Sequence, residues 1–323
     1  MGYFEEALSQ NWLKVYYQPI FNLYSKKICN FEAVSRWQEP GKPALKASRF
    51  IPVLERSGLV YQLDLHVLDH VCQLLNQRRA DNLPTVPVSI TLSPSDFNID
   101  GFIDQVLGIT QKYQIPHNMI QFDLMAQPVA VDQQRLKDAA ANLRKQGFRI
   151  CLDRYGGENI DLSTETLLEY NFDYLKVDVR SFNTNRQRAK IILASVINMS
   201  RLLKIVPVVK GVEDQAMLNF IRSLGIMLTQ GRLLAKEMPE EELSQERDNF
   251  ESVEERALFS GFNHINVLDP YLETRDRLDN NFENPRPNSI FIVQIQQAKL
   301  VYCNSAFRSW TGCAGMTKRS GNT

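Results

Sequence analysis

Short apolar segments alternate with helical segments through most of the chain, and this alternation restricts the fold more than any other feature. The apolar segments are about six residues long, the usual length of a strand, and they recur at intervals of roughly 20–32 residues. Strands are predicted at 86–92, 119–124, 148–153, 172–177, 205–209 and 226–230. Helices are predicted between them at 101–113, 131–146, 163–170, 185–203 and 214–224. The pattern is typical of β-α-β units, whose strands are parallel.

Two further strands precede this alternation. Residues 15–20 and 28–37 are predicted strands, and the short polar link at 24–27 favours a hairpin, so this pair is expected to be antiparallel. Helices are predicted at 47–57 and 60–78, and the second has apolar residues at spacings of three and four. Eight strands in all indicate a closed α/β barrel rather than an open sheet.

The chain changes character after the last predicted strand. Pro239 and the three glutamates after it favour a helix start, because proline suits the first helical turn and acids suit the positive end of the helix dipole. This helix is expected to continue to about Phe259. We expect residues 1–240 to form the barrel, 241–288 a helical linker and 289–323 a small, partial α+β unit.

The charge balance excludes several classes of partner. The chain has 37 basic and 37 acidic residues in 323, so no overall field attracts a nucleic acid polymer or an anionic membrane. No apolar run reaches the roughly 20 residues of a membrane span, and no signal peptide is evident. Five scattered cysteines form no CxxC pair, which is typical of a reducing compartment. We expect a cytoplasmic protein, or a piece of a longer one.

Polar residues gather at the predicted strand ends. In Asp153-Arg154-Tyr155-Gly156 a charged pair directly follows a buried strand, and the carboxyl ends of barrel strands converge on one mouth. The residues of this kind are Glu32, Thr91, Ala126, Asp153, Arg154, Lys176, Lys210, Glu213 and Gln230. Taken singly, each is better explained as an ordinary rim residue. Their convergence favours a site without saying which chemistry it performs.

Several motifs in the same order resemble those of one family. They are Tyr17-Gln18-Pro19-Ile20, Glu32-Ala33-Val34-Ser35-Arg36-Trp37, Phe50-Ile51-Pro52, Asp153-Arg154-Tyr155-Gly156, Leu175-Lys176-Val177-Asp178, Gly211-Val212-Glu213 and Gln230-Gly231. Over roughly residues 4–240 the chain resembles the EAL-domain proteins, which are cyclic di-GMP phosphodiesterases and their inactive relatives. The resemblance implies a variant (β/α)8, TIM-like barrel with one antiparallel strand, in agreement with the predicted hairpin.

The resemblance also implies a site in which acids and an asparagine hold two divalent metal ions, and the metals activate water against a phosphodiester. The family residues that this chain keeps are Glu32, Asp153, Lys176, Glu213 and Gln230. The altered positions are Thr91 for asparagine, Ala126 for the second glutamate of ExTE, Arg154 for the second aspartate of DDFG, and Lys210 for the first glutamate of AEGVE. Gln18, Arg36, Lys176 and Gln230 are the expected ligand-binding residues.

The charges at these positions argue against the metals. Three acids now face three bases, a net charge of zero, where hard divalent cations need several oxygen ligands. A guanidinium about 4 Å from a metal ion is repelled by several kcal/mol even at an effective dielectric constant of 20. We therefore predict that no metal cofactor binds and that hydrolysis is lost.

Three interpretations of the altered site remain open. In the first, Arg154 and Lys210 take the place of the cations and pair with Glu32, Asp153 and Glu213, so that the mouth is a receptor for cyclic di-GMP, with Arg36 binding phosphate. In the second, these ion pairs close the mouth and the barrel is a scaffold for a protein partner. In the third, the domain is an active phosphodiesterase that uses Mg²⁺ or Mn²⁺. Family members often pair through barrel helices, so the resemblance also makes a homodimer plausible.

The last residues show a second, shorter resemblance. Val301-Tyr302-Cys303-Asn304-Ser305-Ala306-Phe307, followed by Thr311-Gly312, resembles the opening of a PAS sensory domain. Only the first third of such a domain is present, so the chain is expected to be cut within it. A hairpin without any such relationship is the alternative explanation.

Overall fold

The barrel predicted from the sequence is present. The computed structural model describes residues 2–125, 133–155, 167, 170–182, 187–260, 289–294 and 297–303. Its strands are β1 (Leu13–Asn22), β2 (Lys27–Trp37), β3 (Leu45–Lys46), β4 (Val88–Leu92), β5 (Ile120–Met125), β6 (Arg149–Tyr155), β7 (Tyr174–Asp178), β8 (Val206–Lys210), β9 (Leu228–Gln230), β10 (Met238–Pro239), β11 (Ser289–Gln294) and β12 (Gln297–Cys303). Its helices are α1 (Gly2–Ser9), α2 (Ala47–Ser57), α3 (Val60–Ala80), α4 (Phe102–Lys112), α5 (Gln133–Lys145), α7 (Gln187–Leu202), α8 (Gln215–Ser223) and α9 (Val253–Ser260).

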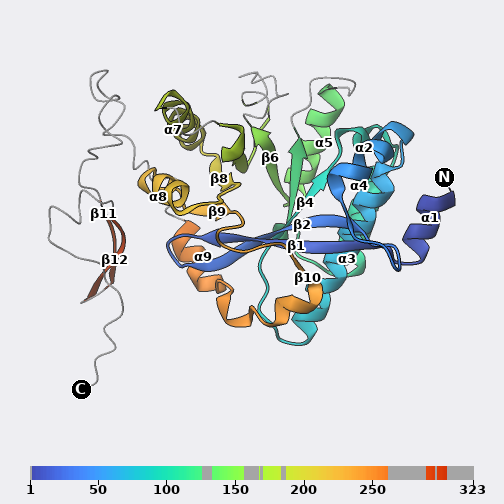
Figure 1. Cartoon of the computed structure of the whole chain (residues 1–323), viewed down its shortest axis with the longest axis horizontal. Coiled ribbons are helices and arrows are strands. Elements are labelled where there is room, and N and C mark those ends of the chain that lie inside the picture. Colours follow the sequence, from blue (N-terminus) through green and yellow to red (C-terminus); the bar gives the residue numbers. More distant parts are fainter. Residues whose placement is uncertain are drawn as a thin grey trace.

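Within the described ranges, eight strands close into a ring. The strands β2, β4, β5, β6, β7, β8 and β9 follow one another in this order, and each neighbouring pair among them is parallel. The strand β1 closes the ring by pairing antiparallel with both β2 and β9, while β10 and β3 add short pairings to β1 and β2. Helices surround the strands (Figure 1). This is the variant (β/α)8 fold, with the single antiparallel strand that was predicted.

Local sequence explains the helices around the ring. Helix α3 buries Val60, Leu63, Val67 and Val71, whose spacings of three and four make one apolar stripe against the strands. Gly147 follows α5 with a φ of 100°, a conformation that L side chains rarely adopt, so the chain turns directly into β6 there. The predicted helix at 163–170 falls on residues of which only Leu167 and Tyr170 are described.

The continuous helix predicted from Pro239 to about Phe259 is wrong. Two short 3₁₀ helices, Glu240–Ser244 and Arg247–Asn249, come first, and only Val253–Ser260 is α-helical. The reason is tertiary. Phe250 forms a bridge with Ile28 and packs its ring 5.5 Å from that of Phe31, and this contact needs an extended backbone.

The segment 250–256 contacts the barrel at the end opposite to the mouth. The backbone N–H of Glu251 donates to the Ile28 carbonyl at 2.8 Å, and the Glu251 carboxylate accepts from the Asn22 amide at 2.7 Å. Lys27 and Glu255 form an ion pair at 2.8 Å. Residues 250–256 therefore pack against the barrel. The division of the chain into three units stays a prediction.

At the C-terminal end, β11 and β12 form an antiparallel hairpin. The hairpin predicted at 290–303 is therefore present. Residues 304–323, which carry most of the PAS-like motif, lie outside the described residues.

Candidate functional site

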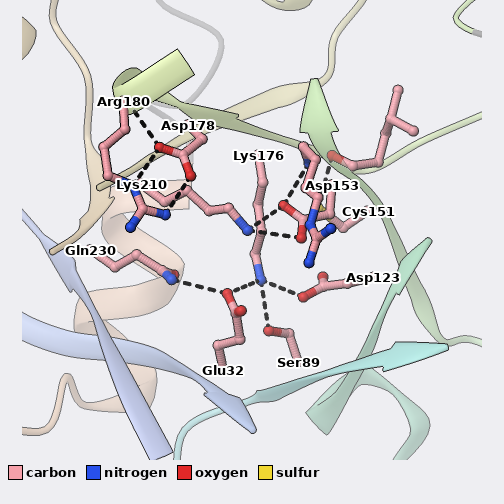
Figure 2. A network of polar contacts seen from close by, with 12 residues as sticks. Glu32, Ser89, Asp123, Cys151, Asp153, Lys176, Asp178, Arg180, Lys210 and Gln230 are labelled. Carbon is pink, nitrogen blue, oxygen red and sulfur yellow. Dashed lines mark hydrogen bonds and ion pairs between the residues drawn. The ribbon is translucent and has the colours of Figure 1, made fainter. Parts of the chain in front are cut away.

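The side chain of Lys176 lies at the centre of the barrel. Its neighbours Leu175 and Val177 point outward under the helices, so the alternation along β7 turns Lys176 inward. The Lys176 Nζ lies 2.8 Å from the Glu32 Oε2 on β2 and 2.9 Å from the Ser89 Oγ on β4, and it forms an ion pair with Asp123 on β5 (Figure 2). One ammonium group therefore links the inward faces of three other strands.

A second ammonium group lies nearer the mouth. The Lys210 Nζ, at the end of β8, is 2.6 Å from Oδ1 and 2.8 Å from Oδ2 of Asp153 on β6. Asp153 also accepts the backbone N–H of Arg154 at 2.7 Å. Both side chains of the pair are almost fully buried. The Lys210 nitrogen thus lies directly against Asp153, the carboxylate of the predicted strand-end motif.

The carboxylate of Glu32 accepts hydrogen bonds from two sides. Besides Lys176, it accepts from the Gln230 amide, whose Nε2 lies 3.0 Å away. Burial acts to raise the pKa of Glu32, but the ammonium groups of Lys176 and Lys210 outweigh it and hold that pKa well below its ordinary value. Glu32 is therefore an anion at neutral pH.

The charges of this cluster are nearly matched. Three carboxyl groups, Glu32, Asp123 and Asp153, face two ammonium groups. Burial and the neighbouring carboxylates raise the pKa of Asp123 against the opposing effect of Lys176. Burial disfavours the charge on Lys176, yet the facing carboxylates of Asp123 and Glu32 raise its pKa well above the ordinary value.

Two of the expected ligand-binding residues contact other parts of the chain. Arg36, at the mouth end of β2, forms an ion pair with Glu237 and donates to the Ser35 carbonyl at 2.8 Å. Gln18, in the middle of β1, donates its amide to the Ala235 carbonyl at 2.8 Å. The segment before β10 therefore satisfies both side chains.

The remaining predicted residues are not all in the cluster. Glu213 is half-exposed and lies 3.9 Å from the Arg232 guanidinium rather than beside Asp153. Thr91 lies on β4 in register with Asp123, and Arg154 is exposed with a φ of 59°. Ala126 lies outside the described residues. The structure thus brings together Glu32, Asp153, Lys176, Lys210 and Gln230.

Sequence reasoning missed Asp123 and Ser89. Each lies within a mostly buried strand rather than at a strand end, and each points inward to Lys176. The available signal was the alternation of Gln121 and Asp123 along β5, which puts two polar side chains on one face, with the Gln121 amide 2.9 Å from the Asp123 carboxylate. The residue after Gln230 has to be glycine. A Cβ on Gly231 would lie 2.0 Å from the Val212 carbonyl oxygen, which is too close for any side chain.

No group of three or more His, Cys, Asp or Glu side chains within the described residues is arranged to hold a metal ion. None of the described helices is long and apolar enough to cross a membrane. The cluster is a network of buried ion pairs, and a metal ion beside Asp153 would have to displace the Lys210 ammonium.

The chain is similar to proteins of one known family. The EAL domain family model matches residues 3–237. The chain belongs to the EAL domain family. An uncharacterized signaling protein from Caulobacter vibrioides is 28% identical over 242 residues, covering 74% of this chain and 29% of the relative. The cyclic di-GMP phosphodiesterase PdeB of Shewanella oneidensis is 28% identical over 241 residues, covering 72% of this chain and 27% of PdeB.

This EAL domain chain spans less than a third of the length of these curated relatives. Among solved structures, the PaMucR phosphodiesterase in its c-di-GMP complex matches with a TM-score of 0.68 at 24% identity, covering 74% of this chain and 97% of that one. At this identity the likeness supports the fold, and the chemistry has to be argued from the residues in the barrel.

Proposed function

We propose that this EAL domain is a catalytically inactive module of cyclic di-GMP signalling that acts as a scaffold for a protein partner. The observation that carries the proposal is the Lys210 ammonium within 2.8 Å of both carboxylate oxygens of Asp153. It supplies the positive charge that a metal ion would supply in an active relative, and the oxygen ligands for two metals are too few. We propose that the domain uses no cofactor. Mg²⁺ or Mn²⁺ would be required only if the domain were an active phosphodiesterase.

The contacts of the mouth favour a scaffold over a receptor. Arg36, Gln18, Lys176 and Gln230 all make hydrogen bonds or ion pairs within the chain. A dinucleotide would have to replace these contacts with its own, and a buried ion pair is costly to break. The relatives named as phosphodiesterases, and the solved relative in a c-di-GMP complex, are what connect this chain to that nucleotide.

Two measurements separate the three interpretations. Incubation with cyclic di-GMP and Mg²⁺ or Mn²⁺ is expected to leave the nucleotide intact on chromatography. Linear product that disappears in Glu32→Ala would overturn the proposal and establish the enzyme. Isothermal titration with cyclic di-GMP in EDTA is expected to show no heat. Binding there would leave the domain inactive but make it a receptor.

The proposal places the barrel in a larger assembly. A protein partner, including a second copy of this chain, is the proposed target of the scaffold, and light scattering after size exclusion tests the homodimer. Residues 289–323 are proposed to begin a PAS-like sensory unit in the same cytoplasmic protein, with the β11–β12 hairpin as supporting observation.

A further inference from the structure

Two aspartates outside the barrel interior approach each other beside β4. Asp64 lies on α3 and Asp96 in the 3₁₀ turn Pro94–Asn98, which directly follows β4. Asp64 is 6% exposed and Asp96 is fully buried. The single backbone N–H of Ser93 donates to both carboxylates, at 3.0 Å to the Oδ2 of each.

One oxygen of this pair has no partner in the described chain. The Oδ1 of Asp96 is inaccessible to solvent and accepts no hydrogen bond. A buried carboxylate oxygen without a partner is costly, and two carboxylates that share one donor repel each other. A proton between the two carboxyl groups removes both problems, because a protonated carboxyl donates a hydrogen bond.

The surrounding charges add to the repulsion. Burial is the largest cause that raises the pKa of each aspartate, and Glu55 of α2 adds to it, while hydrogen bonds from Ser93 act in the opposite direction. Helix α4 contributes an uncharged side chain here, because the ring of Phe102 packs 5.7 Å from the ring of Phe97. From α5, Arg135 pairs with Asp100 at 2.7 Å, beyond the end of the turn.

We propose that Asp64 and Asp96 share one proton at neutral pH and that this proton holds the mouth-side end of β4 against α3. The strand β4 carries Ser89, which binds Lys176, and Thr91, so the pair positions one wall of the barrel interior. The pKa of each carboxyl is raised in the folded chain, so its stabilising effect is complete in acid and is lost as the pH rises through the folded value.

The proton itself can be observed. Carboxyl carbon-13 shifts of the unaltered chain, assigned through the backbone resonances of Asp64 and Asp96, are expected to show one of the two carboxyls protonated at pH 7. Two carboxyls that both titrate near pH 4, as exposed aspartates do, would overturn the proposal. This measurement on the unaltered chain remains decisive even if a variant at either position fails to fold.

Denaturation gives an independent test. The urea midpoint of the unaltered chain is expected to fall between pH 6 and pH 9.5. In Asp96→Asn an amide donor replaces the proton permanently, so this variant should lose most of that fall. The control Asp100→Asn removes an exposed acid nearby and should follow the unaltered chain. The contrary result is an Asp96→Asn variant whose urea midpoint is lower at every pH but falls with pH as in the unaltered chain. That result would contradict the shared proton and give the pair a purely structural role.

Discussion

Lys176 and Asp123 form an ion pair in which both side chains have 0% exposure. Such a pair contributes little net stability relative to apolar residues, but removing one partner leaves a buried charge uncompensated. The pair also fixes β7 to β5 across the barrel interior. Its geometry therefore makes Lys176, a residue that the chain keeps from the family pattern, part of the structural core.

We expect Asp123→Asn to destabilise the chain by about 2 kcal/mol, because Lys176 loses a charged hydrogen-bond partner and keeps Glu32 and Ser89. Urea denaturation measures the change. Asp69→Asn is the matched control, since Asp69 pairs with Lys112 at 2.9 Å on the surface. Solvent screens that exposed pair, so Asp69→Asn should destabilise the chain much less than Asp123→Asn. Equal losses from the two variants would show that the interior pair is not special.

Restoring the family residues should restore metal binding. The variant that combines Thr91→Asn, Ala126→Glu, Arg154→Asp and Lys210→Glu replaces two cations by carboxylates, and we expect it to bind Mn²⁺ in calorimetry while the unaltered chain does not. Lys210→Met is the control, because it removes the ammonium without adding a ligand. Mn²⁺ binding by the unaltered chain would refute the charge argument directly.

The ion pair between Glu32 and Lys176 should resist acid. Its folded pKa is held below the ordinary value of 4.5, so its stabilising effect is complete above pH 4.5 and is lost only as the pH falls through the lower folded value. The difference in unfolding free energy between the unaltered chain and Glu32→Gln should therefore be constant from pH 7 to about 5 and shrink below pH 4.5. A difference that grows on acidification would mean that the pKa shift has the opposite sign.

The segment after β10 should be needed for a stable barrel. Phe250 packs against Phe31. The Arg78 guanidinium lies over the Phe250 ring, 5.0 Å from the centre of that ring. Phe250→Ala should cost about 3–5 kcal/mol, the usual range for a buried phenylalanine. Val253→Ala is the control, because Val253 is 67% exposed and its truncation should change stability by less than about 0.5 kcal/mol. If Phe250→Ala changed the free energy of unfolding only slightly, residues 241–260 would be better described as a linker.

Periodicity alone predicted most of the barrel. The strand predicted at 205–209 is Val206–Lys210, and the helix predicted at 185–203 is Gln187–Leu202. These elements follow from local apolar spacing, which the packing in the barrel reinforces. The helix after Pro239 failed because its strong local start signal lost to a long-range contact, that of Phe250 with the first residues of β2.

The site could be predicted only where a strand end marked it. The sequence shows charged residues within or directly after apolar strand segments at Asp153, Lys176 and Lys210. The structure brings these three side chains into one cluster. Asp123 depends on the register of β5 against β4, which places it beside Thr91, and a single sequence does not show that register. Glu213 follows β8 closely, but it turns outward to Arg232.

The pairing of β1 with both β2 and β9 has a consequence for synthesis of the protein. While the ribosome is still translating the middle of the chain, β1 can join only its hairpin partner, and its other edge stays open to water and to other nascent chains. Ring closure has to wait until residues 228–239 have emerged. The pairing of β1 with β9 is therefore the last contact of the ring that can form during synthesis.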